Sequence, residues 1–309
     1  MQTLVIGFGS IGIRHLEVLR SLGCEVSIVS KRRLGFDRCY LNIKDAINIE
    51  KPEYIVIANK TSEHISTLFE LQKLGFKGTI LIEKPLSHDL FQVQDKEFNN
   101  VFVAYNMRFD PLLQMLIDEL KGERIISSQA YAGQYLPDWR PKIDYRDSYS
   151  AKMQEGGGVL RDLSHELDFM NWIFGGWKRV IAIGGKYSEL EIDSDDVFGL
   201  MFETKNCPLC LLQLNYLDRS ARRDIIVNTS QHVFRIDFIN KTFEKDGVII
   251  RSDFDSNYSY IMQHKAILAK EYKNVCDFTS AKDVMRLIIA AEKSAYLENS
   301  NWVDNEKNL

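Results

Sequence analysis

No stretch of this 309-residue sequence reaches the roughly 20 consecutive apolar residues that a bilayer-crossing helix needs. An excess of positive charge is also missing, because the formal net charge is -4 and the Lys and Arg residues are scattered along the chain. Internal repeats and low-complexity segments are lacking too. These features argue against a membrane protein and against a nucleic-acid partner.

Cysteine is scarce, with five residues in the chain. Residues 1–6 lead directly into the first predicted strand, so we expect no signal peptide and a cytoplasmic protein with reduced thiols. Cys207 and Cys210 have the spacing of a redox or zinc pair, but no second such pair or nearby His pair completes a zinc set. We therefore predict a β-hairpin with two buried thiols and no metal.

The chain is long enough for about two domains, and its pattern changes near residue 120. Before that point, strands alternate with helical segments, as in the βαβ units of a parallel sheet. After it, strand follows strand, which indicates a largely antiparallel sheet. Helices are predicted over residues 159–174 and within 260–297. The predicted strands cover residues 3–6, 25–29, 54–58, 79–82, 101–104, 125–131, 180–187, 197–203, 209–216, 225–228 and 233–238.

The predicted fold class is therefore α/β: a Rossmann-type parallel-sheet domain over residues 1–120, followed by an α+β domain over 121–309 with an open-faced sheet. The first domain opens with Gly7-Phe8-Gly9-Ser10-Ile11-Gly12, directly between a strand and a helical pattern. In that context the first glycine allows a tight turn, the second lets backbone approach a pyrophosphate, and the third lets the helix pack closely. The helix N-terminus then faces the phosphates. We predict a dinucleotide site here.

Ser30-Lys31-Arg32-Arg33 follows the second predicted strand, where the adenosine ribose is expected. A carboxylate there would bind the ribose 2′-hydroxyl and favour NAD, but this stretch has none. Its three cations and one hydroxyl suit a 2′-phosphate instead, and the alternative is a solvated basic loop. We therefore expect NADP in preference to NAD. Asn59, after the strand at 54–58, and His64 are further candidates for the cofactor pocket.

Two constellations could carry the chemistry. Glu83-Lys84-Pro85 follows the strand at 79–82, and therefore lies at the carboxyl edge of the parallel sheet, where ligands bind. Downstream of the triplet 156–158, Asp162, His165 and Asp168 are spaced three apart and would share one helical face. The structural alternatives are an ion pair or exposed strand-end lysine for Lys84, and an N-cap or core position for His165.

These three motifs, at 7–12, 83–85 and 156–168, resemble the Gfo/Idh/MocA family of NAD(P)-dependent oxidoreductases, in matching order over nearly the whole chain. Residues 103–109 are similar to the segment in which that family passes from its first domain to its second. The resemblance implies that Lys84 and His165 lie near the nicotinamide and the reacting carbon, with Asp162 as a nearby carboxylate. Many members have three residues between the aspartate and the histidine, whereas this chain has two.

Hydride transfer at an alcohol or carbonyl carbon requires a proton to leave or join its oxygen. A lysine beside an oxidised, positively charged ring would have a lowered pKa suited to this work. A histidine can share the proton or hold the oxygen. A polar and aromatic loop before the glycine triplet could contact an anionic, hydroxyl-rich ligand, or alternatively pack on a neighbouring subunit. The substrate-binding candidates are Tyr105, Asn106, Arg108, Trp139, Arg140, Tyr145, Arg146, Tyr149 and His165.

The resemblance implies a small-molecule sugar or nucleotide-sugar substrate, and a homodimer or homotetramer formed through the second-domain sheet. We therefore predict an NADP-dependent oxidoreductase that acts on a secondary alcohol or ketone of such a sugar. Two alternatives remain at this stage. One is reduction of an imine or a double bond on the same scaffold, and the other is a sensor or structural protein that binds NADP(H) without turnover.

Overall fold

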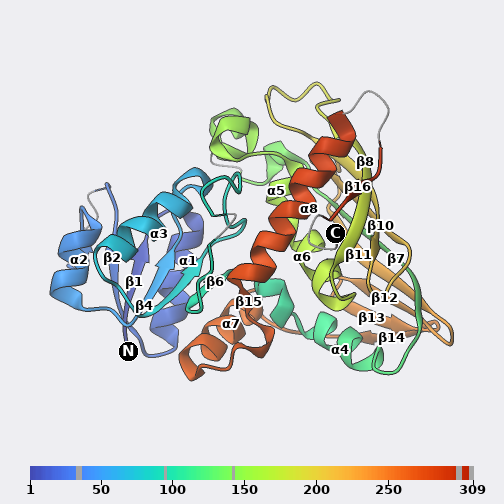
Figure 1. Cartoon of the computed structure of the whole chain (residues 1–309). Helices are drawn as coiled ribbons and strands as arrows, with labels where there is room; N and C mark the ends of the chain where they lie inside the picture. The colour runs from blue at the N-terminus through green and yellow to red at the C-terminus, as the bar shows by residue number, and fades with distance from the viewer. Residues whose placement is uncertain (33–36, 94–95, 141–142, 297–300, 306–309) are drawn as a thin grey trace. The chain divides into compact units, whose positions relative to one another are not determined.

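The structure is a computed structural model that describes residues 1–32, 37–93, 96–140, 143–296 and 301–305 (Figure 1). The chain divides into two compact units. The first unit comprises Met1–Phe109 and Asp255–Lys282, and the second comprises Asp110–Phe254 and Asp283–Leu309. The boundary expected from the sequence, at residue 120, assigns the segment 255–282 to the second domain, whereas in the structure this segment returns to the first unit.

The first unit is built on a seven-stranded sheet in the order β15-β6-β5-β4-β1-β2-β3. All neighbouring strands are parallel except the edge pair β15–β6. The four residues of β4 are all buried, as expected for a strand covered on both faces. The strands are β1 Gln2–Ile6, β2 Glu25–Val29, β3 Cys39–Tyr40, β4 Tyr54–Ile57, β5 Thr79–Ile82, β6 Val101–Val103 and β15 Cys276–Asp277.

In this order the chain reverses direction across the sheet between β1 and β4, which is the topological switch point where open α/β sheets bind ligands. The returning segment packs on the same core, since Ile267 and Val275 belong to its buried cluster. The α-helices of the unit are α1 Ser10–Ser21, α2 Ile43–Glu50, α3 His64–Lys73 and α7 Tyr258–Ala269. Its short 3-10 helices are η1 Thr61–Glu63, η2 Asn106–Phe109 and η7 Tyr272–Asn274.

The second unit is built on a nine-stranded sheet in the order β14-β13-β12-β11-β7-β10-β9-β8-β16. Its pairs are antiparallel except β7 with β10, which confirms the predicted fold class of a parallel-sheet domain with a largely antiparallel second sheet. The strands are β7 Ile125–Gly133, β8 Trp177–Gly185, β9 Val197–Thr204, β10 Cys210–Asn215, β11 Arg222–Thr229, β12 Val233–Asp237, β13 Thr242–Lys245, β14 Val248–Arg251 and β16 Val303–Asp304.

Burial alternates along the central strands of this sheet. In β9, Phe198, Leu200 and Phe202 are buried, while Met201 between them is exposed. Ile183 on the neighbouring strand β8 is also exposed, so one face of the sheet carries apolar side chains at the surface. The helices of this unit are α4 Pro111–Glu119, α5 Val159–Asp162, α6 Ser164–Ile173 and, from Asp283 onward, α8 Phe278–Tyr296, with η3 Leu136–Asp138, η4 Tyr145–Asp147, η5 Tyr149–Ala151 and η6 Met153–Glu155.

One helix prediction needs correction. The single helix predicted over 159–174 is divided into α5 and α6 at Leu163, whose φ of -100° and ψ of 32° are not helical. Asp162 and His165 therefore lie on different helices and do not share a continuous helical face. The helices predicted within 260–297 are confirmed as α7 and α8, with η7 and the short strand β15 between them.

The hairpin predicted around the cysteine pair is confirmed. Strands β9 and β10 pair in antiparallel fashion, and Cys207 and Cys210 are both fully buried free thiols. Among the described residues, no helix is long and apolar enough to span a membrane. Within those same ranges, no group of three or more His, Cys, Asp or Glu residues is arranged to hold a metal ion.

Candidate active site

The glycine turn joins β1 to α1 with the geometry that its sequence predicts. Gly7 has a φ of +103°, and a Cβ there would lie 2.5 Å from the carbonyl oxygen of Ala58, at the end of β4. A Cβ on Gly12 would collide with the carbonyl oxygen of Gly7. At Gly9, by contrast, a Cβ would have none of the described residues within 4 Å, so among these residues the backbone there borders open space. The first and third glycines thus serve the packing of the turn, and the second leaves room for a ligand.

Gly9 is also the N-cap residue of α1 and provides no side-chain cap. No acidic residue lies in the first turn of this helix, although carboxylates are favoured at such positions. The first-turn N–H groups of a helix lack intrahelical partners, and together with the helix dipole they favour an anion. The open backbone at Gly9 and this uncapped helix end fit a pyrophosphate group.

The stretch that the sequence predicts to bind the adenosine ribose follows β2. Ser30 is buried, and its hydroxyl oxygen accepts the backbone N–H of Arg32 at 3.1 Å. Lys31 and Arg32 are exposed, so both cations are accessible to an anionic ligand. Arg33, the fourth residue of this predicted cluster, lies outside the described residues.

Asn59 follows β4, on the other side of the switch point from the glycine turn. Its amide nitrogen donates to the Thr67 hydroxyl at 2.8 Å, while its Oδ1 is buried and has no hydrogen-bond partner in the part of the chain that the structure describes. A buried acceptor of this kind is costly unless something donates to it. The unsatisfied oxygen fits a hydroxyl or amide donor of a dinucleotide bound at this edge.

His64 begins α3 and is fully enclosed. Its Nδ1 lies 3.0 Å from the carbonyl oxygen of Pro85, and its Nε2 lies 3.3 Å from the carbonyl oxygen of Asn59. Burial lowers the pKa of His64 below its ordinary value. The ring therefore links the end of β4 to the turn after β5. Its predicted role in lining the cofactor pocket stays a prediction.

Glu83, Lys84 and Pro85 follow β5 at the carboxyl edge of the parallel sheet, with a cis peptide bond between Lys84 and Pro85. The Lys84 side chain is half-buried. Glu83 is 8% exposed, and its carboxylate accepts hydrogen bonds from two sources. One oxygen lies 2.6 Å from His15 Nε2, and the other accepts the backbone N–H of Lys84 at 3.1 Å. The carboxylate therefore fixes the turn that carries the lysine.

The predicted substrate residues at the end of the first segment are buried. Tyr105, Asn106 and Arg108 are 0%, 5% and 4% exposed. The Asn106 amide donates to the hydroxyl of Ser259 at 2.6 Å, which joins η2 to the start of α7. Their role in binding substrate stays a prediction.

In the second unit, the glycine triplet allows tight packing ahead of α5. Gly156 and Gly158 have φ values of +84° and +113°, a region that L side chains rarely adopt. A Cβ on Gly157 would meet the carbonyl oxygens of Tyr149 and Ser150, and one on Gly158 would meet the carboxylate of Asp195. The triplet thus brings the polar loop next to the helix that carries Asp162.

Asp162 is the centre of a polar cluster that includes residues from the loop. It is 5% exposed, and its Oδ2 accepts the hydroxyl of Tyr216 at 2.7 Å. Tyr149 also interacts with Asp162 and with Arg140, whose guanidinium lies 5.2 Å from the Tyr149 ring centroid. The ring of Trp139 meets that of Tyr216 edge-on at 5.2 Å. Four predicted residues, Trp139, Arg140, Tyr149 and Asp162, are therefore brought together.

The two phenols of this cluster keep their protons. Burial raises the pKa of Tyr149, and the nearby charge of Asp162 raises it further. Burial and Asp162 likewise hold the pKa of Tyr216 well above its ordinary value. Both tyrosines can therefore donate hydrogen bonds at neutral pH, but neither acts as a base.

His165 is half-buried on the first turn of α6. The next residue along the helix ties α6 to the second sheet. Its neighbour Glu166 is fully buried and forms a bidentate ion pair with Arg223 of β11, with distances of 2.6 and 3.1 Å. Asp168 is 1% exposed and lies further along α6. The ion pair fixes the helix against the sheet, and therefore fixes the position from which His165 extends.

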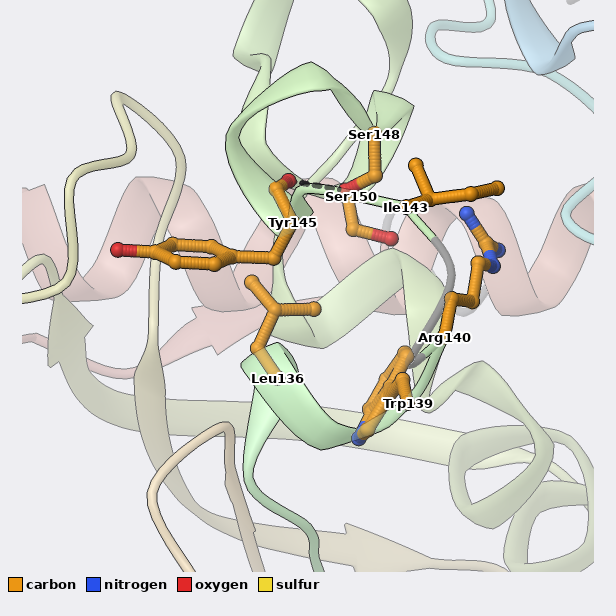
Figure 2. Close-up of a pocket in the computed structure, with 7 residues that line it drawn as sticks. All are labelled: Leu136, Trp139, Arg140, Ile143, Tyr145, Ser148 and Ser150. Atoms are coloured by element: carbon orange, nitrogen blue, oxygen red, sulfur yellow. Dashed lines mark hydrogen bonds between the residues drawn. The ribbon is translucent and has the colours of Figure 1, made fainter.

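Tyr145 and Arg146 belong to the polar loop that precedes the glycine triplet. Their contacts are with residues outside the Asp162 cluster. Arg146 pairs with Asp144 and Glu191, and the Tyr145 hydroxyl accepts the backbone N–H of Glu191 at 3.2 Å. Figure 2 shows Tyr145, Leu136 and Trp139 around a small pocket, with Ser150 among them. The Ser150 hydroxyl is buried and has no hydrogen-bond partner among the described residues, and the pocket has room for about one water molecule.

Sequence reasoning did not identify Tyr216, His15 or His264. Tyr216 follows β10 and bonds to Asp162 from 54 residues away. His15 and His264 bond to each other across 249 residues. No local pattern signals such pairs, although His15 stands on the apolar helix after the glycine turn.

Comparisons with known proteins agree with this architecture. Residues 114–235 match the sequence model of the GFO/IDH/MocA C-terminal domain. Among curated proteins, none matches the chain. An oxidoreductase from Thermotoga maritima has a similar structure, with a TM-score of 0.82 at 16% identity over 100% of this chain and 99% of that one.

Two further solved structures have the same fold. Levoglucosan dehydrogenase in complex with NADH has a TM-score of 0.82 at 17% identity, over 98% of both chains. The WlbA dehydrogenase from Bordetella pertussis, in complex with NADH and UDP-GlcNAcA, has a TM-score of 0.78 at 15% identity, over 98% of both chains. The match over residues 114–235 confirms the predicted resemblance to the Gfo/Idh/MocA oxidoreductases for this domain, and the solved structures share the fold of the whole chain.

Proposed function

We propose that this protein is an NADP-dependent oxidoreductase that transfers a hydride between the nicotinamide ring and a secondary alcohol or ketone of a sugar or nucleotide-linked sugar. The proposal that the protein binds a dinucleotide rests on the residues at the carboxyl ends of β1 and β4, beside the switch point of the first sheet. There the open backbone at Gly9, the uncapped start of α1 and the unsatisfied Oδ1 of Asn59 meet the needs of a pyrophosphate and a polar donor.

The substrate class is proposed from the solved relatives and from the Asp162 cluster. One relative is levoglucosan dehydrogenase, and another binds UDP-GlcNAcA. In this chain, Arg140 and Tyr149 offer a cation and a protonated phenol beside the Asp162 carboxylate, to which the fully buried Tyr216 donates. Such groups bind sugar hydroxyls and an acidic or phosphorylated substituent. We assign Trp139, Arg140 and Tyr149 to substrate binding on this basis.

We propose that Lys84 and His165 handle the proton that leaves or joins the substrate oxygen. A bound nicotinamide would accept or deliver the hydride. Lys84 then takes the proton from the substrate hydroxyl in oxidation, or gives it to the carbonyl oxygen in reduction. His165 holds the substrate oxygen by a hydrogen bond, and Asp162 orients the hydroxyl groups beside it.

Two arguments bear on the choice of cofactor. Three solved complexes of relatives contain NAD or NADH, which favours NAD, but these relatives are only 15–17% identical to this chain. The chain's own ribose-end loop favours NADP, because Ser30, Lys31 and Arg32 offer a hydroxyl and two accessible cations and no carboxylate. We propose NADP because the loop belongs to this protein, whereas the relatives differ at most positions.

The test is a screen of free sugars and UDP-sugars with NADP(H) and NAD(H), followed by absorbance of the reduced ring. Lys84→Ala is expected to lower kcat by about 100-fold or more while cofactor affinity changes little, since a general acid–base group contributes at least about that factor. Lys77→Ala is the matched control, because Lys77 is an exposed lysine ahead of the same strand. Near-normal turnover of Lys84→Ala would overturn the proposed mechanism. Tight NADP(H) binding with no turnover on the whole panel would overturn the proposed activity.

A further inference from the structure

Four buried polar side chains of the first unit form a continuous hydrogen-bonded chain, which we call the Tyr54–Glu83 chain. The Tyr54 hydroxyl lies 2.9 Å from His264 Nδ1, and His264 Nε2 lies 2.8 Å from His15 Nδ1. His15 Nε2 then lies 2.6 Å from a carboxylate oxygen of Glu83. The residues come from β4, α7, α1 and the end of β5, and their exposed fractions are 1%, 0%, 0% and 8%. The chain therefore crosses four separate elements without reaching solvent at either histidine.

The donors and acceptors of this chain fit a single direction. Burial and the neighbouring His15 hold the pKa of His264 well below its ordinary value, so this ring is neutral and has one N–H. Burial holds the pKa of Tyr54 well above its ordinary value, so the phenol keeps its proton and needs an acceptor. His264 Nδ1 is that acceptor, which leaves the Nε2–H of His264 to donate to His15. His15 in turn donates through Nε2 to Glu83, so every proton is directed toward the carboxylate.

The chain ends beside the proposed acid–base residue. The second carboxylate oxygen of Glu83 accepts the backbone N–H of Lys84 at 3.1 Å. Glu83 thus connects this backbone group to His15, on the helix that follows the glycine turn. His15 and His264 are fully buried, so neither can touch a substrate or cofactor. Any effect of these rings on the reaction must be transmitted through Glu83.

We propose that His15, His264 and Tyr54 are positioning residues for Lys84. They hold Glu83 in one rotamer, with its charge directed into the protein, and Glu83 holds the turn from which the Lys84 amine extends. The proposal rests on the proposed function, because it takes Lys84 to be the group that moves the proton. Fully paired buried networks of this kind fix a unique arrangement, whereas a broken one leaves a buried group unsatisfied.

Paired substitutions at His15 test the link to Glu83. His15→Leu removes the N–H that Glu83 accepts, whereas the side-chain amide of His15→Gln can replace it. We expect His15→Leu to lower kcat by about 10- to 100-fold, the range that misplacement of a catalytic group produces, with a smaller change in the KM for cofactor. His15→Gln should recover most of that loss. Leu19→Ala is the control for lost stability, because Leu19 is fully buried on the same helix and lies outside the chain.

A double-mutant cycle separates this proposal from the proposed function. If the chain acts through Lys84, His15→Leu should not lower the residual turnover of Lys84→Ala any further. An equal fold-loss in both backgrounds, or an unchanged kcat in His15→Leu, would overturn the positioning role. Full turnover in Lys84→Ala alone would overturn the proposed function, whatever the His15 variants show.

A measurement without turnover tests the direction of the chain. Nitrogen NMR of the histidine rings should find the Nδ1 atoms of His15 and His264 as hydrogen-bond acceptors, with a proton on the Nε2 of each ring. Tyr54→Phe should shift the signals of both rings, while Tyr272→Phe, which alters an aromatic residue stacked on Phe102 in the same unit, should leave the ring tautomers unchanged. A proton on Nδ1 of His264, or an unchanged His15 signal in Tyr54→Phe, would show that the chain does not run as proposed.

Discussion

Of the three glycines in the turn after β1, Gly9 is the one at which a methyl group would meet open space. Gly9→Ala should therefore leave the fold intact. Its φ of -84° and ψ of -172° lie in an extended region that alanine adopts freely. Alanine is a poorer N-cap than glycine, by up to about 1 kcal/mol, but it also reduces the entropy of the unfolded chain by about 0.4–1 kcal/mol. These effects oppose each other, so the free energy of unfolding should change by less than about 1 kcal/mol.

Cofactor binding should respond very differently. The new methyl group would occupy the space next to the first turn of α1, where the pyrophosphate is expected. Loss of two charge-assisted hydrogen bonds, at about 1.5 kcal/mol each, amounts to about 3 kcal/mol, or about 100-fold in Kd. Gly12→Ala is the matched contrast, because its Cβ would collide with the Gly7 carbonyl oxygen inside the turn. That variant should lose about 1–3 kcal/mol of stability as well as affinity.

The assay combines urea unfolding of each variant with titration of NADPH and NADH by fluorescence. Gly9→Ala should unfold like the unsubstituted protein and bind either cofactor about 100-fold more weakly. Wild-type affinity in Gly9→Ala would refute the assignment of the open space at Gly9 to a pyrophosphate. Strong destabilisation of Gly9→Ala would refute the local geometry from which the argument starts.

Three further predictions follow from exposed and buried groups. Arg32→Glu should lower the ratio of kcat/KM for NADPH to kcat/KM for NADH by about 10- to 100-fold, because an exposed cation that binds a 2′-phosphate would become a repelling carboxylate. Arg251→Glu, at an exposed position of β14, is the control. An unchanged ratio in Arg32→Glu would show that other residues set the cofactor preference. Burial raises the pKa of Asp195 from 3.8 to about 6, so this group stabilises the fold below about pH 4 and that contribution is lost as the pH rises through 6. The free energy of unfolding of Asp195→Asn, taken relative to the unsubstituted protein at the same pH, should therefore be higher at pH 8 than at pH 4, by at most about 3 kcal/mol for a pKa shift of about two units. Parallel pH profiles of the two proteins in urea titrations would contradict this. Ile183 is 67% exposed on the open face of the second sheet, and we expect this face to form the contact between subunits. Ile183→Lys should therefore shift the protein from oligomer toward monomer in sedimentation velocity. If the unsubstituted protein already sediments as a monomer, self-association through this face is ruled out.

The strands of the first sheet were predictable because their sequences are nearly continuous apolar runs. Tyr54–Ile57 and Thr79–Ile82 lie within one residue of their predicted bounds. The edge strand β15 has two residues, and β14 lacks a buried face, so neither produces the alternation on which a strand prediction depends. Sequence patterns of this kind detect buried surfaces and miss elements at the margins of a sheet.

The site was predictable to a lesser extent. The glycine turn and the turn at Lys84 follow from a strand and its carboxyl end, which are local features. The interruption of the helix at Leu163 has no sequence signal, since its neighbours Asp162 and Ser164 are acceptable in a continuous helix. The bonds from Asp162 to Tyr216 and from His15 to His264 depend on how strands and helices are arranged in space. Such contacts are properties of the tertiary fold and are not encoded in local periodicity.

The return of residues 255–282 to the first unit has a consequence for biosynthesis. Ile267 and Val275 complete the hydrophobic cluster around α1 and β4, and β15 closes one edge of the parallel sheet. A nascent chain that has left the ribosome only as far as residue 120 therefore still exposes part of that cluster and lacks His264. The first unit lacks part of its own core until nearly the last tenth of the polypeptide is being translated, so its folding is completed late, after most of the second sheet has been synthesised.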